Sequence, residues 1–203
     1  MNKNDIIALF DILREANPQP RSELRSKNNF QFLVAVVLSA QATDISVNKA
    51  TPALFKAASN PESMVELGVD GIRECIRSIG LYNNKAKNIF ALSQILLGKY
   101  DSEVPDNRTD LESLPGVGHK TASVILNVAF GQSTLAVDTH VFRVANRLGL
   151  VKEKNPTKVE AKLVSIIPPP YLRNAHHWLI LHGRYICTAR SPKCEPFTLS
   201  ATY

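Results

Sequence analysis

The stretch Leu111-Glu112-Ser113-Leu114-Pro115-Gly116-Val117-Gly118-His119-Lys120-Thr121-Ala122-Ser123-Val124-Ile125-Leu126 joins two expected helices through a tight glycine turn. Pro115 rules out continuation of the first helix, and Gly116 and Gly118 allow backbone angles and close approaches that a side chain would forbid. The first N–H groups of the second helix lack intrahelical acceptors and lie at the positive end of its dipole. The stretch therefore predicts a helical hairpin that binds a phosphate oxygen, a contact that does not read bases.

Composition and charge are consistent with a globular protein that has an anionic partner. The chain has 203 residues, of which 44% are hydrophobic, enough for a real core in one large domain or two small lobes. Twenty-four Lys and Arg against eighteen Asp and Glu give a formal charge of +6. This charge favours nucleic acid only modestly over a merely solvated basic surface.

Three features bear on the compartment in which the protein works. The most apolar run, Phe30 to Ala40, is far shorter than the ~20 residues of a membrane-spanning helix. The N-terminus shows no signal-peptide pattern, so we expect a cytoplasmic protein. The three cysteines make no secreted disulfide framework, and we expect them to be thiols or metal ligands.

Apolar spacing and helix-start residues predict an all-α protein of about ten helices without strands. The run 30–40 would also allow a strand, but its length favours a buried central helix. Pro52 is expected to kink or restart a helix that Asp44 caps, and Asp70 to precede a new one. Asn83 or Asn84 is expected to precede a long helix. The final helix is expected from about residue 172, after the triple proline 168–170.

The hairpin motif with Lys120, followed downstream by Val137-Asp138-Thr139-His140, resembles the endonuclease III family of helix-hairpin-helix DNA glycosylases. The resemblance runs from the N-terminus to about Cys194. Three further segments match in order and spacing: Leu38–Asp44, Ile79–Asn83 and His176–Arg184. It implies two helical lobes, with residues 22–131 as a six-helix lobe containing the hairpin and residues 1–21 with 132–203 as the other. The active site would lie in the cleft between the lobes.

The resemblance implies a bifunctional DNA glycosylase and abasic-site lyase that removes oxidised pyrimidines from double-stranded DNA, with Lys120 as the nucleophile. Lys120 lies in the first helical turn, where the dipole disfavours an ammonium ion, and this suggests a use for the neutral amine. From the residues alone, a lysine that contacts phosphate explains this position better. Asp138 is expected both to cap its helix and to assist catalysis.

The family match also implies DNA contacts around the site. Gln41 and Leu81 match residues that fill or brace the duplex after a base is turned out, although a polar helix end and a core leucine are the simpler explanations. The expected hairpin contacts are Gly116, Val117, Gly118 and His119. His119 stands where the family has Arg, which weakens a permanent positive charge there. The other histidines, at positions 140, 176, 177 and 182, are expected to be structural.

The C-terminus departs from the family, which has four cysteines binding a 4Fe–4S cluster. Cys187 and Cys194 match the first two, but the third and fourth positions hold Phe197 and Tyr203. We therefore expect the cluster to be absent or degenerate, with free thiols ranked above a zinc site completed by His182. A truncated or frame-shifted gene end would give the same pattern.

Two alternatives to this function remain open from the sequence. One is a non-catalytic helix-hairpin-helix DNA-binding protein. The other is an adenine-mismatch glycosylase, a subfamily in which the nucleophilic lysine is not expected. For the leading interpretation we expect a monomer that binds damaged or abasic double-stranded DNA and is associated with the bacterial nucleoid.

Overall fold

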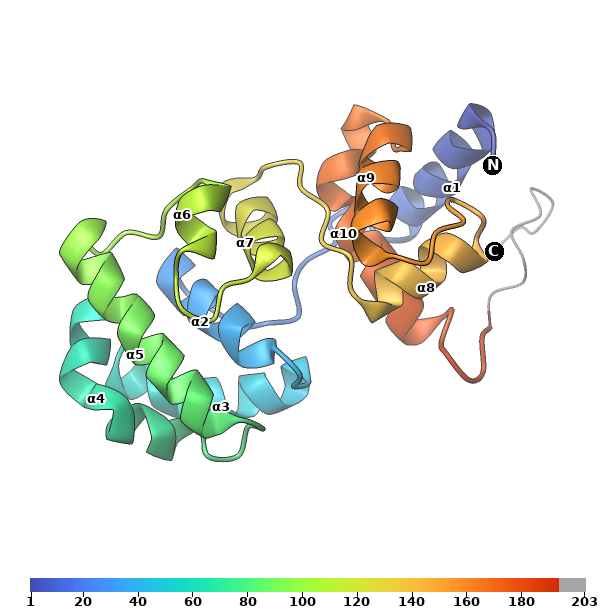
Figure 1. Ribbon diagram of the computed structural model, residues 1–203. Coiled ribbons are helices and arrows are strands. Elements are labelled where there is room, and N and C mark those ends of the chain that lie inside the picture. Colours follow the sequence, from blue (N-terminus) through green and yellow to red (C-terminus); the bar gives the residue numbers. More distant parts are fainter. Residues whose placement is uncertain (194–203) are drawn as a thin grey trace. The chain divides into compact units, whose positions relative to one another are not determined.

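The computed structural model describes residues 1–193, and all regular secondary structure in that range is α-helical (Figure 1), which confirms the all-α prediction. The helices of this range are α1 (Lys3–Ala16), α2 (Asn29–Ser39), α3 (Asp44–Ala57), α4 (Pro61–Ile76), α5 (Tyr82–Lys99), α6 (Arg108–Glu112), α7 (His119–Phe130), α8 (Thr139–Arg147), α9 (Pro156–Ile166) and α10 (Pro169–Tyr185). None of them is long and apolar enough to cross a membrane.

The chain forms two compact units, each with its own core. The first consists of Met1–Arg21 together with the chain from Gly131 onward, and it contains α1 and α8 to α10. The second is Ser22–Phe130, and it contains α2 to α7. Each unit buries a separate cluster of hydrophobic side chains.

Helix α2 is the centre of the 22–130 unit. Every residue from Phe30 to Leu38 is buried, and the helix contacts α3, α5 and α7. Asn28 caps it by accepting a hydrogen bond from the Gln31 N–H. A helix that is apolar on all sides is stable only when other helices surround it, so the helical interpretation of this run is confirmed.

In the middle of this unit, two helices differ from what their proline and aspartate positions predict. Pro52 lies inside α3 without ending it, because buried residues on both sides of the proline, Val47 and Leu54 among them, hold the helix in the core. The helix expected to start after Asp70 is instead the second part of α4, which is kinked at Gly68 (φ 70°).

Two helices start earlier than their side chains suggest. Helix α5 begins at Tyr82, because Leu81 in the left-handed conformation turns the chain into the helix without a side-chain cap. Helix α10 begins at Pro169, since prolines fit the first turn of a helix, where their missing N–H would have no acceptor.

In the other unit, α1 packs on α10 through aromatic side chains. The ring centroids of Phe10 and Tyr171 lie 5.7 Å apart, and those of Phe10 and Trp178 lie 6.2 Å apart. The Trp178 Nε1–H donates to the Asn17 carbonyl at 2.8 Å, and the Tyr171 hydroxyl donates to Asp11 at 2.7 Å. These contacts between chain segments about 160 residues apart explain why the first helix belongs with the last ones.

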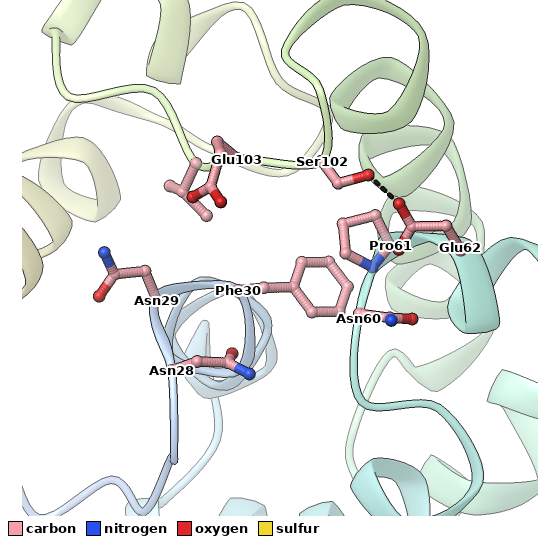
Figure 2. Close-up of a pocket in the computed structure, with 9 residues that line it drawn as sticks. Asn28, Asn29, Phe30, Asn60, Pro61, Glu62, Ser102 and Glu103 are labelled. Atoms are coloured by element: carbon pink, nitrogen blue, oxygen red, sulfur yellow. Dashed lines mark hydrogen bonds between the residues drawn. The ribbon is translucent and has the colours of Figure 1, made fainter.

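A cavity of about 430 Å³ lies at the beginning of α2, between that helix and the beginning of α4 (Figure 2). Phe30 lines it together with two carboxylates, Glu62 and Glu103. The Ser102 hydroxyl donates to Glu62 and holds the pKa of that carboxyl below its usual range. The lining of this cavity is therefore acidic.

Candidate active site

The glycine turn between α6 and α7 is held by a buried apolar support. Leu114 and Val117 are buried, and the Val117 N–H donates to the Leu114 carbonyl at 3.0 Å. Gly116 has φ +83°, and a Cβ on it would lie 3.2 Å from Val37 of α2 and 3.0 Å from Asn88 of α5. The turn is thus pressed against both helices, and only glycine fits at position 116 without strain.

The structure bears on the reasons for two of the expected hairpin contacts, Gly118 and Val117. Gly118 does not have a positive φ, and a Cβ there would meet no atom within 4 Å, so the expected backbone requirement at this position is wrong. What remains at Gly118 is open space that a ligand could enter. The Val117 side chain lies in the core and its N–H donates to the Leu114 carbonyl, so the DNA contact expected of this residue stays a prediction.

His119, the first residue of α7, belongs to a polar cluster on the flank of the hairpin. Its Nδ1 lies 3.1 Å from Glu112 and 3.1 Å from the Arg108 guanidinium. Arg108 also bonds the Glu112 carboxylate and the buried Ser123 hydroxyl, at 3.3 and 3.1 Å. A permanent positive charge therefore lies beside the position where the family has Arg. Our sequence analysis missed Arg108, which only the packing of α6 on α7 brings close to His119.

Lys120 is exposed in the first turn of α7, directly after the hairpin. Its ammonium group makes no ion pair or hydrogen bond with residues 1–193. The amine is therefore exposed on its own unit and accessible to a substrate. A free lysine here can contact a phosphate or attack an electrophilic carbon.

Asp138 is the N-cap of α8, as predicted. Its backbone is extended (φ −96°, ψ −175°), and its Oδ1 accepts a hydrogen bond of 2.8 Å from the Val141 N–H. The carboxylate is half-buried and held in one orientation by this bond. Lys120 belongs to the 22–130 unit and Asp138 to the other unit, so their pairing across a cleft stays a prediction.

Gln41 and Leu81 occupy two exposed turns with the same unusual backbone. Both are non-glycine residues in the left-handed region, with φ values of 55° and 61°. Leu81 is 58% exposed, which excludes the core-leucine explanation, and Gln41 is exposed just after the end of α2. A non-glycine residue keeps this conformation only when its surroundings enforce it, and such residues concentrate at functional sites.

Three of the histidines outside the hairpin are buried, whereas His140 is only half-buried. His176 is buried with its Nδ1 2.8 Å from the Ala136 carbonyl, and His177 and His182 are buried as well. Burial, reinforced by neighbouring His176, lowers the pKa of His177 to about 4. Within residues 1–193 no three His, Cys, Asp or Glu side chains are grouped so that they could bind a metal ion.

The one cysteine of the C-terminal pair that lies in the described range is Cys187. Its side chain is fully buried, and its Sγ accepts a hydrogen bond from Arg147 at 3.4 Å. Cys194, Phe197 and Tyr203 lie outside the described residues. The chain has three cysteines in all, and the third, Cys75, belongs to the 22–130 unit. A cluster that requires four thiolates does not fit this set.

Comparison with known proteins identifies a family. Residues 34–169 match the model of the HhH-GPD superfamily of base excision DNA repair proteins. Endonuclease III of Rickettsia conorii is 57% identical over 92% of this chain and 89% of its own length. Endonuclease III of Escherichia coli K12 is 53% identical over 96% of this chain and 92% of its own length.

Solved structures of complexes agree with these matches. A trapped covalent intermediate of endonuclease III with DNA is similar with a TM-score of 0.89 and 45% identity, over 96% of this chain and 92% of that one. A non-covalent endonuclease III–DNA complex is similar with a TM-score of 0.89 and 44% identity, over 96% and 91%.

Proposed function

Because this chain belongs to the endonuclease III family, it is a DNA glycosylase and abasic-site lyase of base excision repair, and we propose that it removes oxidised pyrimidines through a Schiff base on Lys120. The observation that supports this most directly is the exposed Lys120 amine beside a glycine turn, without an ion-pair or hydrogen-bond partner among residues 1–193. A covalent intermediate with DNA has been trapped for a related endonuclease III, as expected for a lysine nucleophile. An adenine-mismatch glycosylase would not need this amine.

The reaction starts with the neutral amine of Lys120. Its Nζ attacks C1′ of a nucleotide that has been turned out of the duplex, the N-glycosidic bond breaks, and the base leaves with a proton. Opening of the sugar ring then gives an imine between Nζ and C1′. Loss of a proton from C2′ expels the 3′ phosphate, which cleaves the strand, and water hydrolyses the imine to release the enzyme.

Asp138 would serve as the acid–base partner in this scheme. Its Oδ1 is bonded to the Val141 N–H, and a backbone N–H bond favours the ionised carboxylate. An ionised, fixed carboxylate can accept the proton that Lys120 must lose, or stabilise positive charge developing on the sugar.

DNA binding comes mainly from the phosphate backbone. The start of α7 offers N–H groups without intrahelical acceptors next to the open space at Gly118. On the flank, Arg108 and His119 lie in a cluster with Glu112, whose carboxylate offsets part of the positive charge. Gln41 and Leu81 would enter the duplex where the damaged nucleotide leaves it. We propose that the protein acts as a monomer on double-stranded DNA with damaged bases or abasic sites, at the bacterial nucleoid.

The nucleophile is tested by covalent trapping. Duplex DNA containing an oxidised pyrimidine, such as 5-hydroxyuracil, is incubated with the protein under borohydride, which reduces a Schiff base to a stable amine. We expect an adduct with the native protein and none with Lys120→Ala. Lys87→Ala, at an exposed lysine of α5, is the matched control. Trapping that survives in Lys120→Ala would rule out Lys120 as the nucleophile.

We further propose that the enzyme works without the 4Fe–4S cluster of its family. Cys187 and Cys194 supply two of the four thiolates that such a cluster needs. No step above requires the cluster. Protein purified anaerobically is expected to contain far less than four irons and four labile sulfides per chain, and near-stoichiometric amounts would contradict this proposal.

A further inference from the structure

Lys85 is a buried lysine that the reaction scheme does not use. Its side chain is only 5% exposed, and its Nζ donates a hydrogen bond of 2.9 Å to the carbonyl of Leu38. Burial lowers the pKa of this amine. A buried ammonium group destabilises a fold unless it is well bonded, so a lysine in this place needs an explanation.

The Lys85–Leu38 hydrogen bond joins the two turns that hold Gln41 and Leu81. Leu38 is in the last turn of α2, three residues before Gln41. Lys85 is in the first turn of α5, and its N–H donates to the Leu81 carbonyl at 3.1 Å. A positive group is also favoured at the C-terminal end of α2 by the helix dipole.

The carbonyls at the end of α2 accept hydrogen bonds either from donors in the same turn or from Lys85. The Val36 carbonyl accepts from the Ser39 hydroxyl, and the Ser39 carbonyl accepts from the Ala42 N–H. Both bonds lie within the turn itself. The Leu38 carbonyl instead accepts from a residue 47 positions away, so this bond fixes the turn to another element.

The hairpin rests on the same two helix ends. Gly116 is packed against Val37, next to Leu38, and against Asn88, one turn after Lys85. Helix α2 is about 16 Å long at 1.5 Å per residue, and its other end borders the acidic cavity of Figure 2. The two strained turns and the hairpin thus gather at the C-terminal end of α2, opposite the end that borders the cavity.

We propose that Lys85 is a positioning residue that fixes the separation of Gln41 and Leu81, so that both side chains enter the duplex at one base pair. This inference rests on the proposed function. Base pairs are stacked about 3.4 Å apart, so a shift of an ångström or two between the turns would misplace one side chain when the other is in register. Misplacement of this size can slow a reaction by about a hundredfold.

The test compares Lys85→Met with Lys87→Met. Methionine keeps most of the buried volume and removes the donor, whereas Lys87 is exposed on the same helix and serves as the control. The first measurement is the fluorescence of 2-aminopurine placed opposite a tetrahydrofuran abasic-site analogue in a duplex, which rises when that base loses its stacking. We expect the rise on binding to be strongly reduced in Lys85→Met and unchanged in Lys87→Met.

The second measurement is single-turnover excision of 5-hydroxyuracil from duplex and from single-stranded DNA. We expect Lys85→Met to slow excision from the duplex by roughly 10- to 100-fold and to leave the single-stranded reaction within about twofold, because no stacking must be replaced there. Equal losses on both substrates, or no loss on either, would overturn the proposal. A native protein that excises from neither substrate would instead refute the proposed function.

If Lys85→Met does not fold, a double-mutant cycle at Gln41 and Leu81, in protein that keeps Lys85, decides the matter. If the two turns are held at a fixed separation, Gln41 and Leu81 act together on one base pair. The losses that Gln41→Ala and Leu81→Ala cause in duplex excision must then be non-additive. Additive losses would overturn the proposal.

Discussion

Alanine substitutions at the two hairpin glycines should separate folding from DNA binding. Gly116 has φ +83°, a conformation that costs an L-residue roughly 1–2 kcal/mol, and its new Cβ would lie 3.0 to 3.2 Å from Asn88 and Val37. For a chain of this size each kcal/mol corresponds to about 2–4 °C in Tm. Gly116→Ala is therefore expected to lower Tm by about 2–8 °C. Gly118→Ala meets no atom within 4 Å and should leave Tm unchanged or slightly raised.

Binding should follow a different pattern. A methyl group at position 118 occupies the open space where we place a phosphate, so Gly118→Ala should weaken binding to undamaged duplex and reduce the slope of log K against log salt by about 1. Thermal melting by circular dichroism and fluorescence anisotropy of a labelled duplex between 50 and ~200 mM salt measure both effects. A Gly116→Ala protein of native Tm would refute the packing argument. Native affinity and slope in Gly118→Ala would refute the phosphate site.

Three further predictions concern single side chains. Asp138→Asn should keep the helix cap, whereas Asp138→Ala should lose about 1 kcal/mol of stability. Both variants should slow single-turnover base removal by roughly 10²–10⁴. An Asp138→Asn protein of native rate would show that Asp138 is only a cap. Because Leu81 is 58% exposed, Leu81→Ala should change stability by less than about 0.5 kcal/mol yet slow excision from duplex more than from single-stranded DNA, and equal losses would contradict its role. Burial lowers the pKa of His177 from 6.5 to about 4, so this side chain binds a proton more readily in the unfolded chain than in the folded one. Its contribution to stability is therefore complete above pH 6.5 and falls by on the order of 3 kcal/mol toward pH 4. Urea titrations at several pH values should show this loss, and it should shrink in His177→Gln.

Features that depend on a few neighbouring residues were predictable from the sequence. Asp138 caps its helix as expected, because a cap needs only a side-chain oxygen and an N–H two or three residues later. The cap expected at Asp44 is wrong by one residue, because Thr43 accepts the hydrogen bond from the Ser46 N–H. The helical state of 30–38 followed from its length and its uniform apolar character. The position of Lys120 in the first helical turn after the hairpin followed from the motif itself.

Features that depend on tertiary packing were not predictable in this way. Lys85 is an ordinary surface lysine in the sequence, and only its contact with Leu38 shows that it is buried. Arg108 joins the His119 cluster because α6 packs on α7. The left-handed backbone of Gln41 and Leu81 carries no composition signal, since glycine, not glutamine or leucine, is the residue expected there.

The segment after α10 shows how the C-terminal region can be held by protein contacts. Arg143 of α8 donates to the carbonyls of Gly183 and Cys187, at 2.7 and 3.1 Å. Arg147, one turn later, donates to the Thr188 carbonyl at 2.8 Å and to the Cys187 Sγ at 3.4 Å. These bonds tie residues 183–188 to the helix that Asp138 caps. Three of these four bonds are accepted by main-chain carbonyls, so most of this attachment of α8 does not use the Cys187 thiol.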